Sequence, residues 1–83
     1  MEKRIAILGI IVENDASVEY VNELLHDYRE YIIGRMGMPY RERQISVISI
    51  VMDASNDIVS ALSGKLGMLE GVSAKAVYSK KGV

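Results

Sequence analysis

Two short apolar runs restrict what this chain can fold into more than any other feature. Residues 5–12 (IAILGIIV) and 45–52 (ISVISIVM) are rich in β-branched side chains and are too short for core helices, so both are predicted to be strands. In each run, apolar side chains fall on both faces of the strand. That pattern is typical of central strands buried inside a sheet.

A polar cluster and an amphipathic stretch follow each of these strands. The clusters, at 14–17 and 53–56, share the triplet DAS, and their side-chain oxygens can accept hydrogen bonds from the free amides that open a helix. A first helix is predicted to continue to about Tyr28, and a second to Leu66 with Gly67 as its C-terminal stop. The shared triplet hints that the two halves of the chain are a duplication.

The residues that separate the two halves are predicted to form a third strand. This strand, 31–38, is weakened by Gly34 and Gly37. Pro39 lacks the amide hydrogen that a central strand position needs, so it belongs at a sheet edge or at the end of the strand. The charged residues 40–44 then suit a hairpin turn.

A fourth strand completes the pattern. Residues 72–78 alternate in the way of a half-buried strand, and residues 80–83 are predicted to be a frayed tail. The order of elements is therefore βαββαβ. With right-handed crossovers, this order predicts an α+β fold: the ferredoxin-like sandwich, a four-stranded antiparallel sheet with both helices on one face.

The composition limits the classes of function. Eighty-three residues suit a single domain, 1–83, and the net charge of −1 lacks the basic excess that nucleic-acid binding favours. The absence of cysteine excludes disulfides, thiolate metal sites and cysteine catalysis. The apolar run after the N-terminal MEKR has no small-residue cleavage site, and no run is long enough to span a bilayer. We therefore expect a cytoplasmic protein without nucleic-acid or membrane partners.

The face of the sheet opposite the helices is predicted to be apolar. Two helices cover only one face, yet both central strands carry aliphatic side chains on both. Burying each such side chain contributes about 1.5–3 kcal/mol, and leaving them in water invites aggregation. With no other chain implied, we predict a homo-oligomer, a dimer or tetramer, that forms through the sheet face or edge.

The third strand and the turn after it carry the candidate binding residues. Arg35, Arg41 and Arg43 can form an anion pocket, because guanidinium groups match carboxylates and phosphates; the alternative is a solvated, charged hairpin. Gly34 and Gly37 either admit a ligand or second subunit close to the backbone, or only twist an edge strand.

The remaining chemistry-bearing residues do not form a recognisable catalytic set. His26, near Glu23 and Glu30 on the first helix, is better explained as part of a solvated polar face than as a metal ligand. The sequence contains no apolar cleft with paired carboxylates, and a serine–histidine–acid set would have to use a histidine on an outward helix face. We predict no catalytic residues, no metal site, no cofactor and no enzymatic activity.

Two long blocks of the sequence resemble a known family. The stretch YIIGRMGMPYRER at 31–43, and SALSGKLG at 60–67 followed by GVS at 71–73, are similar to the small ACT-like proteins described as regulators of the iron-only hydrogenase system. The resemblance covers essentially the whole chain. It implies a ferredoxin-like domain and an association with hydrogenase-system proteins.

The fold that this resemblance implies is also similar to the effector domain of the nickel-responsive regulators, but their metal site does not carry over. Those proteins place two histidines in alternation on a strand, with a further histidine and a cysteine nearby. The apolar strand at 45–52, with the residue before it, begins QISVIS over 44–49 here, and the chain has no cysteine. Amino-acid-binding ACT domains carry a glycine in the first strand-to-helix turn, where this chain has ENDAS at 13–17.

Taken together, these observations predict a stand-alone ACT-like regulatory module. It would be a homo-oligomer that binds either a small ligand, for which a site between subunits is one arrangement, or a partner protein. The alternative is an assembly factor in hydrogenase maturation that binds no ligand. The candidate surface comprises Gly34, Arg35, Gly37, Tyr40, Arg41 and Arg43, with Asn14 and Asn56 expected together at the other end of the sheet.

Overall fold

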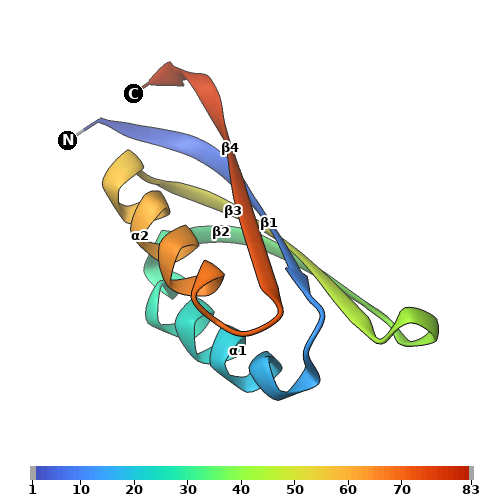
Figure 1. Ribbon diagram of the computed structural model, residues 1–83. Coiled ribbons are helices and arrows are strands. Elements are labelled where there is room, and N and C mark those ends of the chain that lie inside the picture. Colours follow the sequence, from blue (N-terminus) through green and yellow to red (C-terminus); the bar gives the residue numbers. More distant parts are fainter. Residues whose placement is uncertain (1, 83) are drawn as a thin grey trace.

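Four antiparallel strands form one sheet in the order β2-β3-β1-β4, and two helices lie against one of its faces (Figure 1). The structure is a computed structural model that describes residues 2–82. The strands are β1 (Lys3–Val12), β2 (Ile32–Tyr40), β3 (Ile45–Ser55) and β4 (Val72–Gly82), and the helices are α1 (Val18–Asp27) and α2 (Asn56–Gly67). The chain therefore has the ferredoxin-like βαββαβ fold that the pattern predicts.

The core lies between the helices and the side of the sheet that faces them. Alternate residues of the two central strands are buried there: Ala6, Leu8, Ile10 and Val12 from β1, and Ile48, Ile50, Met52 and Ala54 from β3. The helices contribute Val21, Leu25, Val59, Leu62 and Leu66 to the same cluster. The two-residue period of a strand sends the other half of each apolar run to the opposite face, which no helix covers.

The strands are longer than the sequence pattern indicates. β3 continues to Ser55, and β4 continues to Gly82, so the prediction of a frayed tail at 80–83 is wrong for its described residues; Val83 lies outside them. Pairing across the sheet explains the extension, because Gly82 pairs with Arg4 on β1 and the Arg4 guanidinium donates to the Ser79 carbonyl at 2.9 Å. Local polarity at a chain end does not reveal such a neighbour.

The strand with the two glycines is at the edge of the sheet, and Pro39 thus has both of the positions that the sequence left open for it, a sheet edge and the end of a strand. Among the described strands, β2 pairs only with β3, and Pro39 lies next to the last residue of β2, opposite Ser46. The predicted turn at 40–44 is confirmed as well: Arg41–Arg43 form a short 3₁₀ turn, and Gln44 has a left-handed φ of 54°.

The two helix starts use the polar clusters in different ways. The Asn14 side chain accepts from the Ala16 amide at 3.0 Å, and the Ser55 side chain accepts from the Ile58 amide at 3.4 Å. Ser17 does not cap α1; its buried hydroxyl donates to the Glu70 carbonyl at 2.6 Å. This hydrogen bond ties the first strand-to-helix turn to the loop that follows α2.

Gly71 allows this loop to dock. α2 ends at Gly67 as predicted, but the residue with a left-handed φ, +72°, is Gly71. Its carbonyl accepts from the Glu13 amide at 2.7 Å, and a Cβ atom on it would lie 2.7 Å from the Cβ of Asn14. Only glycine satisfies both the backbone conformation and the close approach.

We therefore expect Gly71→Ala to lower the free energy of unfolding by about 2 kcal/mol or more, through the left-handed conformation and the clash with Asn14. Urea unfolding measures this. Gly67→Ala is the matched control, because Gly67 is helical and an added Cβ would meet no atom within 4 Å beyond its own stretch of helix. This change should be neutral or stabilising by up to about 1 kcal/mol. Equal effects of the two changes would contradict the docking role of Gly71.

Candidate ligand-binding groove

A groove runs between α1 and the edge strand β2. Arg35, Gly37 and Pro39 lie on the side of β2 that faces the helices, because they pair with Ile50, Ile48 and Ser46 of β3. The groove consists of three hollows in a row, each sharing lining residues with the next. We call them the hairpin hollow, the glycine hollow and the arginine hollow.

The arginine hollow lies at the C-terminal end of α1 and has a volume of about 440 Å³. Its lining residues are Asn22, Leu25, His26, Arg29, Ile32 and Arg35. Leu25 belongs to the buried core and Ile32 packs against it, so the floor is apolar. The rim carries two guanidinium groups and an imidazole.

The glycine hollow follows along the strand, with a volume of about 250 Å³. It shares Asn22 and Arg35 with the arginine hollow, and Val12, Val18 and Ile48 supply apolar walls. Gly37 lines it, and a Cβ atom built on Gly37 would meet no atom within 4 Å. The missing side chain therefore leaves open space and relieves no close contact inside the subunit.

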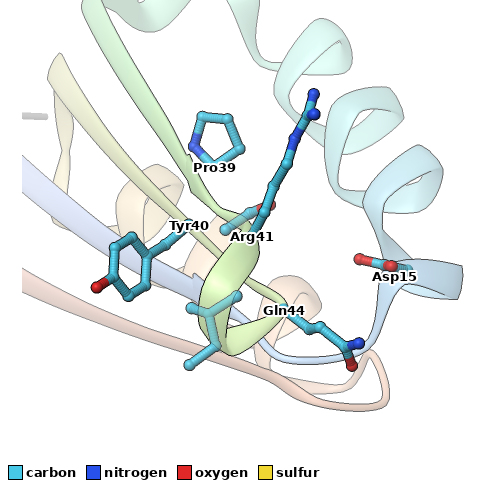
Figure 2. A pocket seen from close by; sticks show the side chains of 7 residues that line it. Asp15, Pro39, Tyr40, Arg41 and Gln44 are labelled. Atoms are coloured by element: carbon cyan, nitrogen blue, oxygen red, sulfur yellow. The ribbon is translucent and has the colours of Figure 1, made fainter.

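The hairpin hollow lies at the end of the sheet, with a volume of about 340 Å³. Figure 2 shows Asp15 across this hollow from Arg41 and Gln44 of the β2–β3 turn. It shares Pro39 and Ser46 with the glycine hollow. Charges of both signs border it, which distinguishes it from the arginine hollow.

Neutral acceptors hold both arginines of the arginine hollow. The Arg35 guanidinium reaches across from β2 to α1 and donates to the Asn22 side-chain oxygen at 2.7 Å. The Arg29 guanidinium donates to the His26 carbonyl at 2.9 Å. Within residues 2–82, neither arginine has an acidic side chain within 4.0 Å; the ion pair found there joins Arg4 and Glu2. Two positive charges thus stand beside an apolar floor without a carboxylate.

The structure brings together only some of the residues that the sequence suggested. Arg35, Gly37, Tyr40 and Arg41 line the groove. The predicted pocket of three arginines is not assembled, because Arg35 lies in mid-strand whereas Arg41 and Arg43 belong to the turn. Gly34 pairs with Val51 and so faces away from the groove.

The prediction that Asn14 and Asn56 meet at one end of the sheet is wrong. β1 and β3 are antiparallel neighbours, with Lys3 opposite Ser55 and Val12 opposite Ser46. The strand-to-helix turns that follow them therefore lie at opposite ends. Asn14 caps the turn near the hairpin end, and Asn56 lines a separate hollow with Arg4.

Three groove residues were missed, namely Asn22, His26 and Arg29. Asn22 and His26 occupy the polar side of α1, which periodicity alone assigns to solvent, and Arg29 begins a short 3₁₀ turn just after the helix. The four-residue spacing of Asn22 and His26 places these two side chains on one strip of the helix surface. The partner of that strip, β2, is known only once the sheet order is known.

Other groups with possible chemistry lie elsewhere or are not grouped. Across residues 2–82 there is no cluster of three or more histidine, aspartate or glutamate side chains suited to a metal ion. Lys65 Nζ lies over the ring of Tyr28, 5.1 Å from its centroid, and the interaction with the Tyr28 side chain raises the pKa of Lys65. Of the described helices, none is long and apolar enough to cross a membrane.

The fold defines the chain as an ACT-like domain of the ferredoxin-like class. Its residues 4–76 match the TM1266-like family, described as "Iron-only hydrogenase system regulator, putative". The chain belongs to this family. The resemblance seen in 31–43 and 60–73 is thereby confirmed.

A solved relative supports the same assignment. The uncharacterized protein TM1266 from Thermotoga maritima is 45% identical, with a TM-score of 0.91 over 95% of this chain and 100% of that one. A formyltetrahydrofolate deformylase from Pseudomonas putida has a TM-score of 0.67 at 13% identity, over 93% of this chain and 29% of that one, which shows a shared fold alone. No curated protein sequence matches the chain.

Filling the glycine hollow should leave the fold intact. We expect Gly37→Val to raise the free energy of unfolding by roughly 0.5–1 kcal/mol, because valine suits a strand better than glycine and meets open space here. Urea unfolding measures the change, with Gly37→Ala as a control that adds only the Cβ atom. A loss of more than about 1 kcal/mol would contradict our view that the subunit fold does not need this glycine.

Proposed function

We propose that this protein regulates the iron-only hydrogenase system as a non-catalytic homo-oligomer of the cytoplasm, which binds a small ligand or a partner protein at the groove. Membership of the family supports the regulatory role. The observation that carries the proposed assembly is the apolar, uncovered face of the sheet. The alternative, an assembly factor without a ligand, keeps the same surface and leaves the groove without a function.

The uncovered face carries exposed apolar side chains on all four strands. We call it the open face; its large apolar residues, 36–70% exposed, are Ile5, Ile7, Ile11, Met36, Met38, Val47 and Val77. Burying even half of them against a partner contributes several kcal/mol, at about 1.5–3 kcal/mol for each side chain. Contiguous apolar surface of this kind is typical of an interaction site.

The relief of the open face favours a second copy of the same chain as its partner. On the two central strands one row has small residues, Ser49 beside Gly9, with Met36 and Lys75 at its ends on the edge strands. The rows on either side contain Val47 with Ile11 and Val51 with Ile7. A hollow of about 410 Å³ lies along Gly9. One face thus carries both ridges and a furrow. This combination suits a two-fold interface in which the ridges of each copy pack into the furrow of the other.

Gly9 strengthens this argument. A Cβ atom there would have one neighbour within 4 Å, the Lys75 carbonyl oxygen at 3.9 Å, an ordinary contact. Glycine costs a strand stability, and no close approach inside the subunit requires it. We infer that the furrow at Gly9 receives side chains of the second copy.

The first test is the native mass of the protein, purified without oxygen under conditions that preserve non-covalent complexes. We expect a dimer or tetramer. Ile7→Glu places a charge in the middle of the interface and should give a folded monomer, since an unpaired buried charge is strongly unfavourable. Met68→Glu is the control: Met68 is 86% exposed on the loop after α2, so the oligomer should persist. A monomeric native protein would refute the proposed assembly.

Filling the furrow should separate assembly from folding. Gly9→Leu is expected to weaken association at least about tenfold through steric conflict with the second copy, while the subunit keeps or gains stability. The average mass, measured by light scattering over a dilution series, gives the dissociation constant, and circular dichroism reports whether the subunit is folded. Unchanged association would mean that the open face is not the contact surface.

A further inference from the structure

We propose that the arginine hollow binds a small organic anion, one that joins a carboxylate or phosphate group to an apolar body. This proposal rests on the proposed function for its regulatory meaning, but the binding itself follows from the residues of the hollow. It names the class of ligand and assigns roles to Arg29, Arg35 and Asn22.

The charge of the hollow selects an anion. Arg29 and Arg35 come from different elements, and each donates one hydrogen bond to a neutral oxygen. A guanidinium has five N–H donors. Within residues 2–82 each of these two groups uses one of them, so most of the donors can bind a ligand. None of the described lining residues is acidic. Planar guanidinium groups match the paired oxygens of a carboxylate or phosphate.

The positions of the two arginines are set before a ligand arrives. The 2.7 Å hydrogen bond to Asn22 holds the Arg35 guanidinium between β2 and α1, and the bond to the His26 carbonyl holds Arg29 at the end of α1. Because these long side chains are held in place in advance, less conformational entropy is lost when a ligand binds. Asn22 therefore acts as a positioning residue for Arg35.

The floor of the hollow selects an apolar body on that anion. Leu25 is 2% exposed, and Ile32 packs against the core beside it. A bare inorganic anion leaves this surface wet, whereas a ring or aliphatic chain covers it. The volume of about 440 Å³ falls within the range of small-molecule sites, so the hollow suits a metabolite-sized ligand better than a protein segment.

Nuclear magnetic resonance of ¹⁵N-labelled protein tests this with probes of graded chemistry. Phenyl phosphate and phenylacetate each supply an oxyanion and a ring, inorganic phosphate supplies only charge, and benzyl alcohol supplies only the ring. We expect saturable shifts of the Asn22–Arg35 amides with at least one of the two ring anions, weaker binding as salt rises, and much weaker effects of phosphate and benzyl alcohol. Whichever of phenyl phosphate and phenylacetate binds more tightly tells whether the natural ligand carries a phosphate or a carboxylate.

Single substitutions assign the effect to the hollow. Arg35→Gln and Arg29→Gln should each weaken the preferred probe by about tenfold or more, as expected for loss of a charge-assisted hydrogen bond. Arg43→Gln removes the same charge from the hairpin turn, outside the three hollows, and should leave the affinity within about twofold. Asn22→Ala should weaken binding less than Arg35→Gln and should not abolish it.

Several results would overturn the proposal. These are no saturable binding of either ring anion, equal binding of inorganic phosphate, or equal losses in Arg43→Gln and Arg35→Gln. The native mass, recorded on the same samples, keeps the two proposals apart. An oligomer that binds neither ring anion refutes the ligand class alone, and a monomer that binds one at these residues refutes the assembly alone.

Discussion

The rest of the structure depends on the antiparallel pairing of β1 with β3. Their register runs without interruption from Lys3 opposite Ser55 to Val12 opposite Ser46, and it places two doubly apolar strands at the centre of the sheet. Half of their side chains meet the helices and form the core. The other half has no cover within the subunit, because two helices fill one face of a four-stranded sheet and leave the other open.

The same pairing decides where the groove forms. β2 pairs with β3 on the side away from β1, so it becomes an edge strand that the helices cover least (Figure 1). There the absence of a side chain at Gly37 leaves a hollow, and Arg35 bridges the space to α1 through Asn22. A central strand could not keep such a gap without losing core packing.

β2 also connects the two proposed activities of the molecule. Its residues alternate, so Met36 and Met38 belong to the open face while Arg35 and Gly37 belong to the groove. In the proposed function, a ligand that tightens the link between Arg35 and α1 would act on the strand that carries part of the subunit interface. Ligand binding and assembly would then be coupled through one short edge strand without any moving domain.

The sequence by itself determined the order of elements, the ferredoxin-like fold and the apolar character of the open face, because strand and helix periods and turn residues are local properties. It also predicted that Gly34 and Gly37 weaken the strand at 31–38, and that Pro39 lies at a sheet edge or at the end of that strand. It could not show that Asn14 and Asn56 end at opposite sides of the sheet, that β4 continues to Gly82, or that Arg35 meets Asn22, His26 and Arg29 rather than Arg41 and Arg43. Those outcomes depend on which strands become neighbours and in which direction they run. Contacts between residues distant in the chain are decided by that packing, so only the tertiary structure revealed the arginine hollow.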